Sequence, residues 1–179
     1  MRKNINGQPT MEELIEKVNK LKETGELDLS MEEDLSIAIM NLISLEEHFY
    51  FTAEKTGNDE YFDLLNQTRG IRKQLLAKMI DKHEGETWCI AKHLLAATMR
   101  LMEVGTKLQS SGKKEESEDM FKKAYEIYSL FWALRLKLIN MSDVKKIGGN
   151  QINIHDKSGS DKPMTKEDII SKLIDCCKE

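Results

Sequence analysis

The chain has few of the residues that interrupt helices. Its 179 residues include two prolines, and its ten glycines fall almost entirely outside the segments in which apolar residues recur at helical spacing. The remaining stretches are rich in leucine, lysine, glutamate, methionine and alanine, which are strong helix formers. The sequence therefore predicts an all-α protein.

Other absences exclude whole classes of protein. No run of 18 apolar residues is present, and no hydrophobic segment follows the basic N-terminus, so we expect neither a membrane-spanning helix nor secretion. The formal net charge is -4 and acidic and basic residues are interspersed, which leaves no basic surface for nucleic acid. We expect a cytoplasmic protein that binds neither membranes nor nucleic acid.

Cysteine is scarce, with only Cys89, Cys176 and Cys177. An odd number that includes an adjacent pair does not suit a disulfide framework, so reduced thiols are expected. Adjacent cysteines form only a strained disulfide. Cys176 and Cys177 are therefore interpreted as small residues at the end of a docking helix and not as a redox pair.

Capping and turn signals divide the chain into helices. Thr10 with Glu13, and Ser30 with Glu33, form two capping boxes at the starts of the first two helices. Turn signals then separate helices at about 30–55, 59–82 and 86–111 from one that ends near Ile139. Four long helices joined by short turns predict an antiparallel up-down four-helix bundle.

The predicted organisation places this bundle at residues 30–140, after an appended helix within residues 1–29. Residues 141–164 are polar and lack periodicity, which is typical of a flexible linker. Residues 165–179 form a short helix with a narrow apolar stripe of Ile169, Ile170, Leu173 and Ile174. We expect this helix to dock on the bundle or on a partner.

One segment follows a known repeat pattern. Leu101, Val104, Gly105, Leu108, Gly112, Ser117, Phe121, Ala124 and Ser129 have the spacing of the signature positions of the tetratricopeptide repeat. Residues 101–129 thus resemble one such repeat, although four signature residues are replaced and no second copy precedes it. The resemblance implies a tight helical hairpin in which Gly105 and Ala124 allow close approach.

Cys89 and His93 stand four residues apart on a predicted helix, a spacing that suits two metal ligands. A helical wheel places Cys89 on the polar side and His93 at the border of the apolar face. The further ligands that zinc requires would have to come from residues scattered along the chain, namely Glu47, His48, His83, Cys176 and Cys177. The Glu-x-x-His motif of di-iron bundles does not occur. We therefore favour neither a metal site nor a cofactor.

Charged residues on apolar helix faces are the more informative feature. Glu46, Arg72 and Arg135 each lie among apolar residues at helical spacing, and Arg69 lies about 60° from Arg72 on the wheel. In one interpretation Glu46 and Arg72 form a buried ion pair that fixes helix register, while Arg135 reaches solvent or caps a carbonyl group. In the other, Arg72, Arg69 and Arg135 together with Glu46 bind a small anion in an apolar pocket.

No nucleophile with a neighbouring base is recognisable, so an enzyme is the less favoured class. The favoured function is a non-enzymatic helical interaction module. It would contact a protein partner or a second copy of itself through the polar face of the helix at 86–111 or through the terminal helices. The alternative is a small-anion-binding or metal-binding helical bundle, including an enzyme that uses the Glu/Arg cluster.

Overall fold

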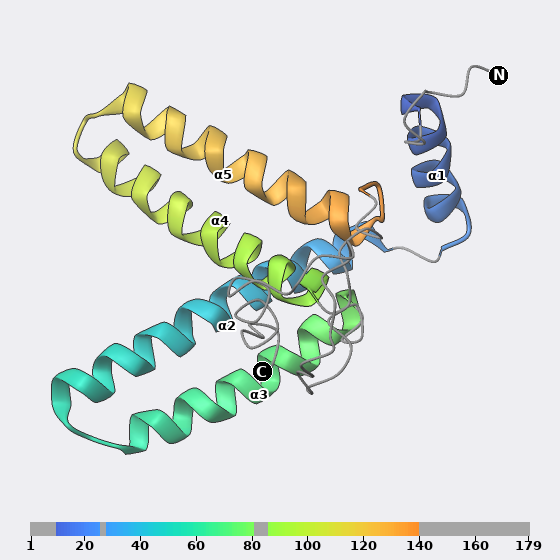
Figure 1. Cartoon of the computed structure of the whole chain (residues 1–179). Helices are drawn as coiled ribbons and strands as arrows, with labels where there is room; N and C mark the ends of the chain where they lie inside the picture. Colours follow the sequence, from blue (N-terminus) through green and yellow to red (C-terminus); the bar gives the residue numbers. More distant parts are fainter. Residues whose placement is uncertain (1–9, 26–27, 81–85, 140–179) are drawn as a thin grey trace, which may run out of the picture. The chain divides into compact units, whose positions relative to one another are not determined.

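The computed structural model describes residues 10–25, 28–80 and 86–139. These residues form five α-helices and no strand, which confirms the all-α prediction: α1 (Met11–Glu23), α2 (Leu29–Thr56), α3 (Glu60–Met79), α4 (Glu86–Ser110) and α5 (Lys114–Arg135) (Figure 1). All five helices belong to one compact unit. None of the described helices combines the length and the apolar character that a membrane crossing requires.

Local capping interactions set several helix ends. The capping box predicted at the start of α1 is present, because Thr10 Oγ1 accepts from the Glu13 amide at 3.3 Å and the Thr10 amide donates to Glu13 Oε2 at 2.8 Å. At the end of α2, Gly57 adopts the left-handed conformation with φ of 65°. A glycine takes this conformation without the steric penalty of a side chain, so the chain can turn sharply into α3.

The predicted start of α2 was wrong. Its N-cap is Asp28, whose Oδ1 accepts from the Met31 amide at 3.1 Å, and Ser30 lies inside the first turn. The negative carboxylate of Asp28 also interacts favourably with the positive N-terminal end of the helix dipole, whereas a serine carries no charge. The last described helix, α5, ends at Arg135, before the predicted Ile139, and Lys137 has a left-handed φ of 53°.

The corrected N-cap leads to a simple mutational prediction. Asp28→Ala should lower the free energy of unfolding by about 1 kcal/mol, because the Met31 amide loses its acceptor. Ser30→Ala is the matched control and should change stability by less than about 0.5 kcal/mol, since Ser30 is an exposed helical residue. Urea denaturation of both variants checks this, and a larger loss for Ser30→Ala would restore the original assignment.

The helices pair as two antiparallel hairpins, α2–α3 and α4–α5, each closed by a short turn (Figure 1). The hairpins meet chiefly through α2 and α4. In an up-down bundle of sequential neighbours α2 and α4 would lie diagonally opposite, and α3 would pack on α4. The all-helical class is therefore established, but the predicted bundle arrangement is not confirmed.

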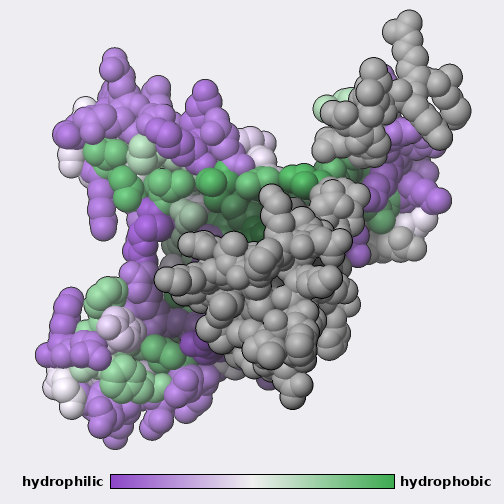
Figure 2. Space-filling view, in the orientation of Figure 1, coloured by the Kyte–Doolittle hydropathy of each residue, from purple (hydrophilic) through white to green (hydrophobic). Residues whose placement is uncertain are grey.

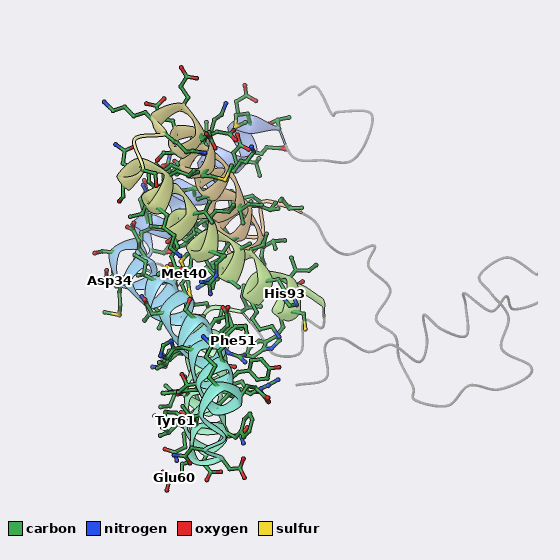
Figure 3. All side chains as sticks on the ribbon, turned by 90° about the vertical axis from the view of Figure 1, so that its left-hand side faces the viewer. Asp34, Met40, Phe51, Glu60, Tyr61 and His93 are labelled. Atoms are coloured by element: carbon green, nitrogen blue, oxygen red, sulfur yellow. The ribbon has the colours of Figure 1, made fainter. Side chains whose placement is uncertain are left out.

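The core lies where the hairpins meet. Most of its buried apolar side chains come from Ile39 and Met40 of α2, Leu76 and Met79 of α3, Trp88, Ala91 and Leu95 of α4, and Phe131 and Leu134 of α5. Figure 3 labels Met40, which is buried, and Phe51 further along α2, which is about half exposed. Within the described residues every buried polar side-chain atom has a hydrogen-bond partner. The core residues named above lie mostly in the parts of the helices that are remote from the turns closing the two hairpins.

Candidate functional site

Glu46 of α2 and Arg72 of α3 form the ion pair that the first interpretation predicted. Arg72 Nε donates to Glu46 Oε1 at 2.8 Å, and Arg72 Nη2 donates to Glu46 Oε2 at 3.2 Å. The Arg72 side chain is 2% exposed and that of Glu46 is 14% exposed. A two-point contact of this kind fixes the relative height of the two helices, because both donors of the guanidinium group are directed in one plane.

Arg135 does not join Glu46. Its Nε and Nη2 donate to Glu32 Oε2 and Oε1 at 2.9 and 2.6 Å, so its guanidinium group meets a carboxylate instead of capping a carbonyl group, and its side chain is 22% exposed. Glu32 lies near the start of α2, far along the helix from Glu46. Arg69 is partly buried and has an interaction partner of its own. Arg72 and Arg135 thus pair with different carboxylates instead of converging on Glu46.

This distribution weakens the premise of the anion site. That hypothesis required surplus positive charge beside Glu46, whereas Arg72 and Arg135 each meet a carboxylate in a two-point contact. To bind an anionic ligand, guanidinium donors engaged in this way would have to give up their contact with a carboxylate of the protein. Anion binding by Arg72, Arg69, Arg135 and Glu46 stays a hypothesis, and the observed contacts favour the structural role.

A further ion-pair cluster links α2 to α4 at the surface. Arg100 of α4 contacts Glu47 of α2 and Glu103 of its own helix, and all three side chains are about half exposed. Exposed pairs contribute little to stability because water screens them. The cluster nevertheless occupies the polar face of α4, one of the two surfaces that the sequence suggested for partner binding.

Cys89 is in a different environment from the one predicted. The wheel placed it on the polar side of α4, but it is buried, like its neighbour Trp88, whereas His93 is exposed (Figure 3). The wheel assumed that α4 packs on one side only, and the start of α4 is covered on more than one side. No group of three or more histidine, cysteine or acidic residues that could hold a metal ion occurs among the described residues. Cys176, Cys177 and the segments 141–164 and 165–179 lie outside the described residues.

The α4–α5 hairpin is as tightly packed as the repeat resemblance implied. A Cβ atom built on Gly105 would lie 2.6 Å from Cε1 of Phe121, and Ala124 is buried. Ser117 Oγ donates to the Gly105 carbonyl oxygen at 2.8 Å inside this contact. Further along α5, the Tyr128 hydroxyl lies 2.7 Å from Ser36 Oγ of α2. Small residues therefore hold α4 and α5 close along their length.

The same hairpin carries an apolar surface that the predicted bundle did not anticipate. Its residues, here called the hairpin apolar face, are Leu101, Val104 and Leu108 of α4 and Met120, Ile127 and Leu130 of α5. Spacings of three, four or seven residues place each set along one side of its helix. All six are partly or largely exposed, and Figure 2 shows hydrophobic surface along this hairpin.

The sequence contained a signal for this face. On a wheel of the helix at 86–111, Leu101, Val104 and Leu108 fall within an apolar arc that is too broad for one neighbouring helix to cover. In a four-helix bundle two neighbours would share such an arc. Because the hairpins meet mainly through α2 and α4, part of the arc stays accessible.

The contacts of Gly105 and Ser117 describe a close hairpin but do not establish kinship with the tetratricopeptide repeat. No protein-family model matches the chain, and neither a curated protein nor a solved structure is similar to it. The function proposed for this chain therefore depends on its own surfaces and contacts.

Proposed function

We propose that the chain is a non-enzymatic helical interaction module that binds an amphipathic helix of a protein partner along the hairpin apolar face. The observation that carries the proposal is the exposure of apolar side chains from two adjacent helices on one side of the hairpin. Contiguous exposed apolar surface of this kind marks interaction sites in proteins.

The shape of the surface indicates the class of partner. On α5 the hairpin apolar face extends from Met120 to Leu130, so at 1.5 Å per residue it offers an apolar strip roughly 15 Å long. The strip between two antiparallel helices suits a third helix, whose apolar residues at i, i+3, i+4 and i+7 would pack against it. An extended peptide would instead need a sheet edge, and the described residues form no strand.

The polar face of α4 is the weaker candidate for this role. Arg100 and Glu103 on that face already contact each other and Glu47 of α2. A partner that bound there would have to displace these contacts. The ion pairs also give no reason to assign catalysis, because each arginine contact described involves a carboxylate that it neutralises.

The test compares two double variants that remove exposed apolar side chains. Val104→Ser with Leu130→Ser truncates the hairpin apolar face, where the two residues are 39% and 41% exposed. Met102→Ser with Ile71→Ser is the control: it truncates two equally exposed apolar residues, and Met102 points away from Val104 because two residues rotate a helix by roughly 200°. Neither variant touches the buried core.

Proteins captured from cells by the intact chain are identified, purified and titrated against all three chains by calorimetry. The Val104/Leu130 variant should bind such a protein at least about tenfold more weakly, whereas the control should match the wild type. Equal affinity for the Val104/Leu130 variant would rule out the hairpin apolar face as the binding surface. Thermal unfolding of each variant shows whether the helices remain folded.

A further inference from the structure

Helix α1 has the sequence of an amphipathic helix but buries none of its residues. Met11, Leu14, Val18 and Leu21 recur at alternating spacings of three and four, with Ile15 beside them. This is the a and d pattern of helices that pair along a narrow seam. In the structure none of the 13 residues of α1 is buried, and Met11 and Ile15 are more than half exposed.

Such a helix gains stability only when its apolar stripe is covered. Isolated helices of about 12–15 residues are marginal in water, and the capping box adds little by itself. At the surface, Lys17 Nζ of α1 donates to the carbonyl oxygen of Lys137, just beyond the end of α5, at 2.8 Å. The apolar stripe on α1 is therefore available to an additional surface.

The charges on α1 indicate what that surface is. Its first turn carries Glu12 and Glu13, and its last turn carries Lys20 and Lys22. Two parallel copies would place acid beside acid and base beside base. Two antiparallel copies would place the acidic turn of each beside the basic turn of the other, and would also align the helix dipoles favourably.

We propose that α1 pairs antiparallel with α1 of a second copy of the chain, so that the protein is a dimer. The heptad pattern sets the register: Leu14 of one copy lies opposite Val18 of the second, and Met11 lies opposite Leu21. In this register Glu12 of one copy is level with Lys20 of the second. The proposal concerns α1 alone and does not depend on the hairpin apolar face.

Sedimentation equilibrium of the full chain over a wide concentration range tests the dimer. The wild-type mass should rise from 20.6 kDa towards twice that value. Ile15→Ser with Val18→Ser should raise the dimer dissociation constant at least about tenfold, because it removes apolar contact at the seam. Glu16→Ser with Asn19→Ser is the matched control: it also introduces two serines, but away from the seam and outside the charged first and last turns, so it should dimerise nearly as well as wild type.

Cysteine cross-linking tests the orientation. In a background with Cys176→Ala and Cys177→Ala, which keeps the buried Cys89, a mixture of Leu14→Cys and Val18→Cys chains should form disulfide-linked dimers faster than either chain alone. Faster cross-linking of Leu14→Cys with itself would overturn the antiparallel arrangement. A wild type that stays monomeric at all concentrations, or a dimer unaffected by Ile15→Ser with Val18→Ser, would overturn the proposal.

The proposed dimerisation through α1 and the proposed binding of a partner helix can be contradicted independently of each other. The Val104/Leu130 variant should still dimerise, and the Ile15/Val18 variant should still bind an amphipathic helix through the hairpin apolar face. Loss of dimerisation in the Val104/Leu130 variant would mean that this face, and not α1, joins the copies, which would overturn the pairing through α1.

Discussion

Glu46→Gln and Arg72→Met should each lower the free energy of unfolding by about 3 kcal/mol, because either change leaves a charge of the buried pair without its partner. The double variant should recover much of this loss, since methionine packs well among apolar neighbours and both charges of the pair are gone. Urea denaturation of the wild type and the three variants gives the coupling energy directly.

The matched control is the exposed pair of Arg100 and Glu47, which also joins two helices through an arginine and a glutamate. Both side chains are about half exposed, so Arg100→Met and Glu47→Gln should couple by less than about 1 kcal/mol. A coupling energy for Glu46 and Arg72 no larger than that of this control would mean that solvent reaches the pair. If the Glu46/Arg72 double variant keeps its stability but loses a ligand found in a metabolite screen, the anion-binding hypothesis would gain support.

The sequence was sufficient to predict the Glu46–Arg72 pair because a short turn joins their helices. When the connection between α2 and α3 is a few residues long, counting from the turn gives the relative height of any two positions at 1.5 Å per residue. The wheel supplied the facing direction, and together they brought the two side chains within reach. No short turn joins α2 to α5, which are far apart in the chain. Counting from a turn therefore could not predict the contact of Ser36 with Tyr128 or that of Glu32 with Arg135.

The same reasoning explains why the arrangement of the hairpins was not predicted. Helix periodicity identifies which side of a helix is apolar, but several pairings of two hairpins bury similar areas. In the structure α2 contacts α4, and the start of α4 is covered on the side that carries Cys89. A wheel drawn for one neighbouring helix therefore misplaced Cys89 and did not show that Val104 stays exposed.

A capping residue in the sequence predicted the start of a helix correctly only where no second capping residue stood nearby. Thr10 is followed by Glu13 and has no alternative cap nearby, and its capping box was predicted correctly. At the start of α2 both Asp28 and Ser30 are good N-cap residues. The pattern with Glu33 favoured Ser30, but the helix starts two residues earlier at the carboxylate.

Gly105→Val should lower the free energy of unfolding by about 2 kcal/mol. Even a Cβ atom at this position would lie 2.6 and 2.8 Å from two ring atoms of Phe121, well inside ordinary carbon–carbon contact. The buried hydrogen bond from Ser117 to the Gly105 carbonyl group opposes a simple separation of α4 and α5. Overpacking of a tight contact typically costs about 1–3 kcal/mol.

Two further variants separate this close contact from the general effect of replacing a helical glycine. Gly70 lies within α3, and a Cβ atom there meets nothing within 4 Å, so Gly70→Val should raise stability by a few tenths of a kcal/mol through helix propensity alone. In a Phe121→Ala background the obstruction at Gly105 is removed, and Gly105→Ala should then stabilise by up to about 1 kcal/mol. Thermal and urea unfolding measure all three changes. If Gly105→Val behaves like Gly70→Val, then Phe121 moves aside freely and Gly105 is not required for the close packing of α4 against α5.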